Sequence, residues 1–127
     1  MSAFANITLG DRTPTNVVFG PAGIDSSGVA KFLVAADASY DAKRSLTMSV
    51  ALPKNGSNVV RVKQKVMIPI MDAVDSSLKV AEAYVTMEAV IPKQASLAQR
   101  QDLKAFAKNF LLDAVTTAAY ENFEAIY

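Results

Sequence analysis

Apolar and polar side chains alternate with a period of two along much of the chain up to Pro92, a pattern that predicts β-strands. Two short strands are predicted at residues 4–9 and 16–19. The intervening residues 10–14 carry Gly, Asp and Pro, so these strands are expected to form an N-terminal hairpin. Longer strands are predicted at residues 29–35, 45–52, 59–68 and 79–91.

Turn-forming residues separate these segments. The alternation is interrupted at residues 20–23 and 25–28, which are rich in Gly, Pro, Asp and Ser. These residues are expected to end the second short strand. Residues 53–58 have Asn55-Gly56 at their centre, which is typical of a tight hairpin turn. A connecting loop is predicted at residues 70–78.

The period changes after Pro92 and predicts helix. Apolar residues recur at helical spacing, at Leu103, Phe106, Ala107, Phe110, Leu111 and Ala114. Ser96, with Gln99 three residues later, is the pattern of a capping box at the helix start. Asp113 and the β-branched pair Thr116-Thr117 are the expected place for a break.

Strands followed by helices predict an α+β fold with an antiparallel sheet. The length of 127 residues suits one domain, residues 1–127, with a single core. A helix of about 20 residues would be about 30 Å long, which is long for so thin a domain. Its apolar face is therefore expected to need a partner subunit, which predicts an obligate oligomer.

Composition narrows the possible chemistry. The chain has no Cys and no His, so disulfides, the usual zinc sites and Ser-His or Cys-His dyads are excluded. Carboxylate, lysine or tyrosine catalysis stays open, but no spacing suggests such a site, and we predict no enzyme activity and no cofactor. No apolar window reaches roughly 18 residues, so no membrane span is expected. The N-terminus lacks a signal-peptide pattern, and synthesis in the cytoplasm is expected.

The charge is placed locally, because the net charge is only +1. Arg61, Lys63 and Lys65 alternate with apolar residues, so one face of this strand would carry three cations. Four basic residues and no acidic one lie between Lys54 and Lys65. This pattern favours a sheet that binds a polyanion on its open face, although a solvated basic face is the alternative.

The sequence resembles the coat proteins of the single-stranded RNA bacteriophages, the levivirus type. The resemblance covers nearly the whole chain. It is carried by the order and spacing of five segments: Ser27 to Ala30 (SGVA), Leu46 to Val50 (LTMSV), Val66 to Pro69 (VMIP), Tyr84 to Pro92 (YVTMEAVIP) and the terminal Ile126-Tyr127.

The resemblance implies a fold and an assembly. An N-terminal β-hairpin would precede a five-stranded antiparallel sheet and two C-terminal α-helices, which pack across the partner's sheet in an interlocked homodimer. Dimers would assemble into an icosahedral shell, commonly T=3, in the bacterial host cytoplasm to form the virion. The other sheet face would bind genomic RNA. One dimer would bind an RNA hairpin at the replicase start and thereby repress translation.

The resemblance also implies the residues that face the RNA. Carried over by position, they are Val29, Thr47, Ser49, Arg61, Lys63, Lys65, Tyr84 and Thr86. The cations would neutralise phosphates and Tyr84 would stack on an unpaired base. Thr47 and Ser49 would bond base edges, and Val29 would form an apolar pocket wall.

Three positions depart from the family's pattern. Ala51 and Ser45 replace residues that are often basic or polar, and Thr86 replaces the asparagine of some members. The resemblance therefore implies general RNA contact more directly than the choice of one hairpin. The loop at residues 70–78 matches the loop at the shell's symmetry axes and lacks the cysteines that crosslink some shells.

Several residues have a second interpretation. Asp72 and Asp75 have the oxygen chemistry of a calcium site between subunits, but a solvated loop is favoured and we predict no metal. Phe106 and Phe110 are interpreted as core or interface residues. On the RNA side, the acidic residues Glu82 and Glu88 are predicted to pair with Lys63 or Lys65 across the sheet. The sequence does not identify a partner for Gln64.

Three functions compete. The first is a self-assembling coat protein whose dimer sheet binds RNA. The second is a dimeric RNA-binding regulator that never forms a shell; the N-terminal hairpin and the apolar-rich residues 70–74 favour the shell, because both suit contacts between dimers. The third is a small carboxylate- or lysine-dependent enzyme, which would need a concave site with convergent groups.

Overall fold

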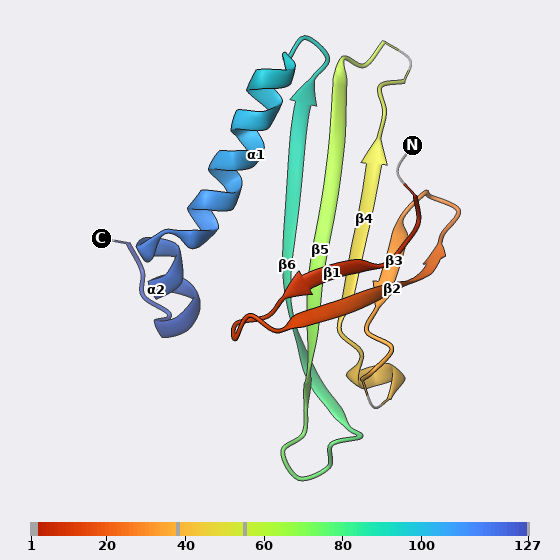
Figure 1. Cartoon of the computed structure of the whole chain (residues 1–127), viewed down its shortest axis with the longest axis vertical. Coiled ribbons are helices and arrows are strands. Elements are labelled where there is room, and N and C mark those ends of the chain that lie inside the picture. Colours follow the sequence, from red (N-terminus) through yellow and green to blue (C-terminus); the bar gives the residue numbers. More distant parts are fainter. Residues whose placement is uncertain (1–2, 38, 55, 127) are drawn as a thin grey trace. The chain divides into compact units, whose positions relative to one another are not determined.

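The computed structural model describes residues 3–37, 39–54 and 56–126. The chain forms two compact units, Met1–Val90 and Ile91–Tyr127. The first unit holds most of the sheet and the second holds the helices (Figure 1). Asn55 of the predicted hairpin turn and Tyr127 of the terminal motif lie outside the described residues.

The described strands form one six-stranded sheet in which sequence order is also spatial order. Its strands are β1 (Ile7–Gly10), β2 (Asn16–Ile24), β3 (Ala30–Leu33), β4 (Ser45–Ala51), β5 (Val59–Met71) and β6 (Lys79–Pro92). Neighbours from β1 to β5 pair antiparallel. The predicted α+β class is confirmed: the N-terminal hairpin and antiparallel strands, six in the described residues, are followed by two C-terminal helices.

Strand β2 differs from its prediction. Residues 20–23 were expected to end it, but it continues to Ile24. The register moves from Pro21 opposite Phe32 to Gly23 opposite Lys31, so a bulge absorbs one extra residue. Gly23 has a φ of 149°, which glycine adopts without a Cβ clash. The prediction of a break was wrong because a bulge accommodates the turn-type residues inside a paired strand.

The core lies on one face of the sheet. Phe19, Phe32, Val34 and Leu46 are the buried apolar side chains of the described residues. Phe32 pairs with Leu46, which pairs with Val66, so these three residues share a face. In Figure 1 the β1–β2 hairpin crosses in front of the long strands, and its Phe19 joins this cluster. The hairpin therefore covers part of the apolar face.

A tightly bonded segment connects β3 to β4. It contains the 3₁₀-helix η1 (Tyr40–Ala42). Arg44 Nη2 lies 3.0 Å from Asp37 Oδ1, and Arg44 Nε and N–H both donate to Asp37 Oδ2. Partial burial raises the pKa of Asp37, but the hydrogen bonds and charge of Arg44 outweigh it and leave the pKa lowered. Lys43 Nζ donates to three backbone carbonyls, those of Val34, Ala35 and Asp37.

The second unit contains α1 (Leu97–Leu112) and α2 (Ala114–Asn122). The capping box is confirmed: Gln99 N–H donates to Ser96 Oγ at 3.2 Å, and Ser96 N–H to Gln99 Oε1 at 2.9 Å. Asp113 separates the helices and caps α2 by accepting from Val115 N–H at 3.0 Å. The break was predicted at Asp113 or Thr116-Thr117; it is at Asp113, and the threonines lie within α2.

Both helices leave their apolar side chains exposed. None of their residues is buried in the described chain, and Phe106 and Phe110 are 72% and 68% exposed. An exposed apolar face of this kind is typical of an interaction surface. None of the described helices is long and apolar enough to cross a lipid bilayer.

Candidate nucleic-acid interface

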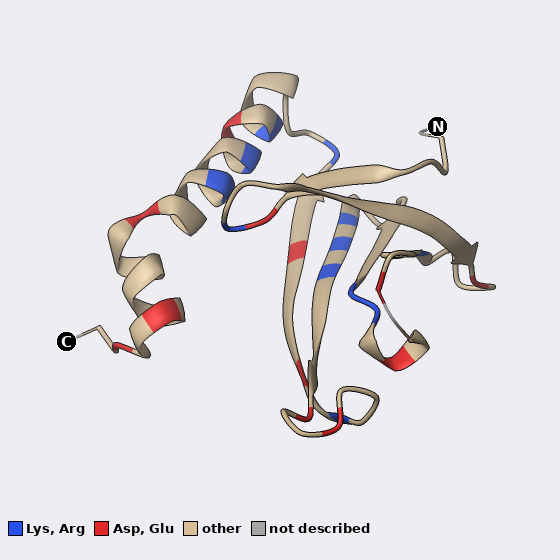
Figure 2. Cartoon of the chain, turned by 60° about the horizontal axis from the view of Figure 1, so that its bottom comes forward, with Lys and Arg blue, Asp and Glu red and all other residues tan. Residues whose placement is uncertain are grey.

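Pairing of β4 with β5 builds a polar face opposite the core. Thr47 pairs with Lys65, Ser49 with Lys63 and Ala51 with Arg61. Side chains that are directly opposite on antiparallel strands point to the same face. Figure 2 shows the result as three basic bands along β5. The predicted grouping of Thr47 and Ser49 with the three cations is therefore present.

Strand β6 adds its even-numbered residues to this polar face. Tyr84 and Glu88 each interact with a cation of β5. Thr86 lies between them at the same parity, so it belongs to the same face. Seven of the eight predicted RNA-facing residues thus lie on three adjacent strands. The face is open, since Arg61 and Lys63 are 53% and 60% exposed.

Glu88 lies between two of the cations. Its Oε1 is 3.4 Å from Arg61 Nη1, and its Oε2 is 3.3 Å from Lys63 Nζ. The predicted pairing of Glu88 with Lys63 is confirmed. Glu82 does not follow the prediction: its Oε2 lies 3.4 Å from Lys79 Nζ, a neighbour on its own strand. Because these pairs are solvent-exposed, each is weak and readily exchanged for another anion.

Lys65 has a different environment. Its Nζ lies 4.5 Å from the centre of the Tyr84 ring, which is a cation–π distance. No acidic group of the described residues forms an ion pair with Lys65. Tyr84 is 62% exposed, so its ring is available to a flat ligand. The arrangement can bind a phosphate and stack a base at neighbouring positions.

The residues around β3 differ from the predicted RNA-facing set. Val29 lies one residue before β3, half-buried, where its N–H donates to Asp25 Oδ1 at 3.0 Å. The sequence interpretation missed Lys31, which pairs with Thr47 and so shares the face of Lys65. Its position two residues after Val29 was the available signal, since that spacing keeps a strand face. Lys31 Nζ lies 5.8 Å from the centre of the Tyr40 ring.

Gln64 belongs to the opposite face. It pairs with Met48, and its Nε2 lies 3.9 Å from the Met48 sulfur, a weak acceptor. This contact supplies the partner that the sequence did not identify.

The loop from Asp72 to Leu78 is held by its own carboxylates. Asp72 Oδ1 accepts from the N–H groups of Val74 and Asp75, and Asp75 Oδ1 accepts from Ser77. The N–H bonds from Asp75 and Val74 lower the pKa of Asp72, and the Ser77 hydroxyl and N–H lower that of Asp75. Over residues 3–37, 39–54 and 56–126, no three His, Cys, Asp or Glu residues gather as metal ligands. Val74 is 97% exposed at the loop tip.

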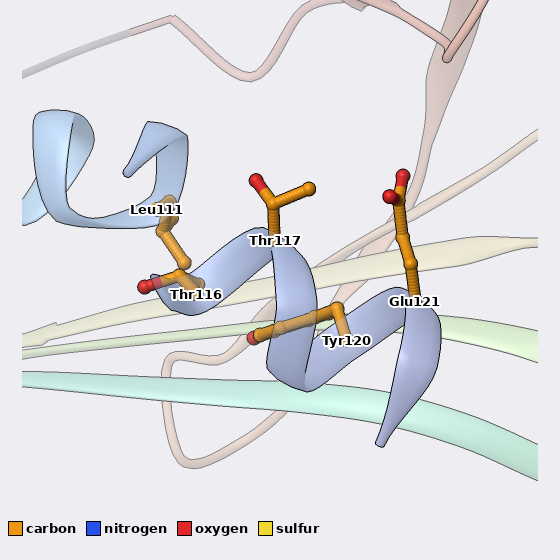
Figure 3. Close-up of a pocket in the computed structure, with 5 residues that line it drawn as sticks. All are labelled: Leu111, Thr116, Thr117, Tyr120 and Glu121. Carbon is orange, nitrogen blue, oxygen red and sulfur yellow. The ribbon is translucent and has the colours of Figure 1, made fainter. Parts of the chain in front are cut away.

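A shallow hollow lies where α1 meets α2. Figure 3 shows its lining residues, Leu111, Thr116, Thr117, Tyr120 and Glu121. The one charged group of this lining is a carboxylate, so the hollow offers no positive charge to a polyanion. The basic face of the sheet is the better candidate site.

The sequence matches a known protein family. Residues 2–127 match the family described as levivirus coat protein. The chain belongs to the levivirus coat protein family. This is a family of viral structural proteins rather than of enzymes. No curated protein sequence matches the chain significantly.

Solved structures share the fold of this coat-family chain. A virus-like particle of Beihai levi-like virus 21 is 26% identical with a TM-score of 0.90, covering 99% of both chains. A virus-like particle of bacteriophage ESE058 is 23% identical with a TM-score of 0.87, covering 99% of this chain and 100% of that one. A bacteriophage structure described as an unassembled coat protein dimer and an RNA-binding dimer is 20% identical with a TM-score of 0.68, covering 99% of both.

Proposed function

We propose that this chain, as a single coat-protein domain of residues 1–127, forms dimers that build an icosahedral T=3 shell around single-stranded genomic RNA. The observation that carries the RNA-binding role is the stripe of Arg61, Lys63 and Lys65, with Tyr84 beside it on an exposed face. The basic side chains of this stripe would neutralise RNA phosphates and release the cations condensed on them. The proposed contact surface also includes Thr47, Ser49, Thr86 and Val29, which directly precedes β3.

The dimer is supported by the helices. Phe106 and Phe110 are mostly exposed in the single chain, and we infer that a second subunit covers them. A related chain of 26% identity forms a virus-like particle, and a more distant one is described as an RNA-binding dimer. We propose the same order of assembly here, in the cytoplasm of a bacterial host, with the virion as the final location.

Binding of one genomic hairpin at the replicase start, with repression of translation, belongs to the same proposal. The hydroxyl groups of Thr47, Ser49 and Thr86 supply hydrogen bonds to base edges, and Tyr84 supplies a stacking surface. No catalytic step, cofactor or metal is part of the proposed function. The second candidate is a dimeric RNA-binding regulator without a shell, favoured by the same basic face.

One experiment tests the RNA role and the shell together. Protein purified from expressing cells is examined by negative-stain electron microscopy and by its 260/280 nm absorbance ratio. Wild type is expected as uniform spheres that carry nucleic acid, and the double variant Lys63→Ala/Lys65→Ala as folded dimers or particles with less RNA. Lys104→Ala/Lys108→Ala, which removes the same charge from α1, is the control and should retain RNA.

The outcomes separate the candidates. Homogeneous dimers that bind RNA without particles would favour the regulator. RNA content in the Lys63/Lys65 variant equal to that of the control would refute the basic face as the packaging surface.

A further inference from the structure

A second lysine–tyrosine pair lies beside the predicted RNA-facing residues. Lys31 of β3 pairs with Thr47, and Thr47 pairs with Lys65, so the three side chains form one row across β3, β4 and β5 on the polar face. Lys31 Nζ lies 5.8 Å from the centre of the Tyr40 ring. At the other end of the row, Lys65 Nζ lies 4.5 Å from the centre of the Tyr84 ring. The row therefore has a cation and an aromatic ring at each end.

The segment that carries Tyr40 is held by several contacts, but Tyr40 itself is exposed. It lies in η1, in the connection from β3 to β4 (Figure 1). This connection is fixed by the Asp37–Arg44 ion pair at 3.0 Å and by the hydrogen bonds of Lys43 to three carbonyl groups. Tyr40 is nevertheless 69% exposed, so it contributes little to the core. A preorganised ring of this kind loses little conformational entropy when a flat ligand stacks on it.

Lys31 is positioned for a phosphate. Over residues 3–37, 39–54 and 56–126, no acidic side chain forms an ion pair with Lys31, and Asp41 of η1, next to Tyr40, is no exception. A lysine ammonium has three N–H donors, so contact with one ring leaves donors for an anion. Lys31 can therefore bind a phosphate without first breaking an ion pair.

We propose that Lys31 and Tyr40 form a second RNA contact, an inference that rests on the proposed RNA-binding function. An unpaired base stacks on Tyr40, and a neighbouring phosphate pairs with Lys31. A single-stranded segment then crosses the sheet from β6 to β3 along the row. Neighbouring strands are about 4.8 Å apart, so the backbones at Lys31 and Lys65 are about 10 Å apart and belong to one continuous surface. Because every base has a face that can stack, this contact accepts unpaired RNA of any sequence.

Photo-crosslinking tests this contact directly in the wild-type protein. Oligouridylate of about 20 nucleotides, which is long enough for several stacking sites, carries 4-thiouridine and is irradiated on the purified protein. Mass spectrometry then locates the crosslinked residues, which are expected to include both Tyr40 and Tyr84, because a stacked base touches the ring. Crosslinks at Tyr84 without any at Tyr40 would overturn the second contact. Absence of RNA binding and of any crosslink would instead overturn the proposed function.

Binding of the same RNA, measured by fluorescence anisotropy over a range of salt concentrations, separates stacking from charge. Tyr40→Leu should weaken binding by about 5- to 150-fold, the range for one lost base stack, and should leave the slope of log K against log salt unchanged. Tyr40→Phe keeps the ring and is the matched control, which should bind like wild type. Lys31→Gln should reduce the slope by about 0.7, because one single-strand phosphate contact is lost. Lys104→Gln on α1 removes the same charge and should leave the slope unchanged.

The variants also distinguish failure of this inference from failure of the RNA-binding role. Wild-type affinity for Tyr40→Leu, with a wild-type slope for Lys31→Gln, would overturn the second contact while Lys65→Gln still weakens binding. A loss of affinity in Tyr40→Phe equal to that in Tyr40→Leu would refute stacking on Tyr40, because the ring is retained.

Discussion

Replacement of Phe106 by Ala is the sharpest test of how the helices are covered. Phe106 lies near the middle of α1 and is 72% exposed in the single chain. Its neighbour one turn later, Phe110, is 68% exposed. If a second subunit covers this face, the exposed part of the ring becomes buried in the dimer. The loss caused by Phe106→Ala then depends on the dimer rather than on the single chain.

The stability lost through Phe106→Ala is expected to be larger if a partner subunit covers the ring than if only the single chain does. A phenylalanine buries roughly 200 Å² when fully covered, so an exposure of 72% leaves about 140 Å² for a partner. At about 25 cal/mol per Å², this area is equivalent to about 3.5 kcal/mol per subunit. Within the single chain only about 60 Å² is covered, or about 1.5 kcal/mol, and the better helix propensity of Ala offsets about 0.5 kcal/mol of that loss.

Urea denaturation at several protein concentrations distinguishes these cases. For a dimer, the midpoint of wild type should rise with concentration, and Phe106→Ala should lower the free energy of unfolding by about 4.5 kcal/mol per subunit. Gln101→Ala is the control, since five residues of helix place it about 140° around α1 from Phe106. A midpoint independent of concentration, with a loss of about 1 kcal/mol or less, would refute burial of Phe106 by a partner.

Two further predictions concern the loops. Deletion of residues 72–77 should leave dimers intact but impair particle formation. Val74 in this loop is exposed, and the hydrogen bonds found for the loop in the described chain join its own residues. Normal particles by electron microscopy would contradict this prediction. Asp37→Asn should destabilise the fold by about 1–2 kcal/mol near neutral pH. Because the pKa of Asp37 is lowered on folding, its contribution is present above the unfolded pKa of about 3.9 and is lost as pH falls through the folded pKa. Denaturation of both proteins from pH 7 to pH 2.5 should show the difference shrinking below about pH 4, and a constant difference would argue against the Arg44 ion pair.

Local patterns predicted most of the elements. The alternation at residues 45–52 and 59–68 predicted β4 and most of β5, because side-chain parity in a strand depends only on neighbouring residues. Ser96 and Gln99 marked the start of α1 for a similar reason: both partners of the capping box lie within four residues. The bulge in β2 was missed because it depends on pairing with β3, which residues 20–23 alone do not reveal.

For the candidate site, the sequence predicted which residues share a strand face but not which of them meet across strands. The spacing of Arg61, Lys63 and Lys65 predicted that these residues share one face of β5. Lys31 lies on the same face of the sheet because it pairs with Thr47, which in turn pairs with Lys65. Of the two acidic residues on β6, sequence could not tell which pairs with β5, since the answer depends on the register between those strands. Glu88 reaches Arg61 and Lys63, while Glu82 reaches Lys79.

By itself the sequence determined the fold class, the helix start, the polar face of β5 and the family, because these properties depend on local spacing and on motif order. Tertiary structure alone decided which side chains meet across strands: the Glu88 link between two cations, the Lys65–Tyr84 contact and the core around Phe32. The physical reason is that cross-strand contacts depend on register and bulges, and a shift of one residue turns each side chain to the opposite face.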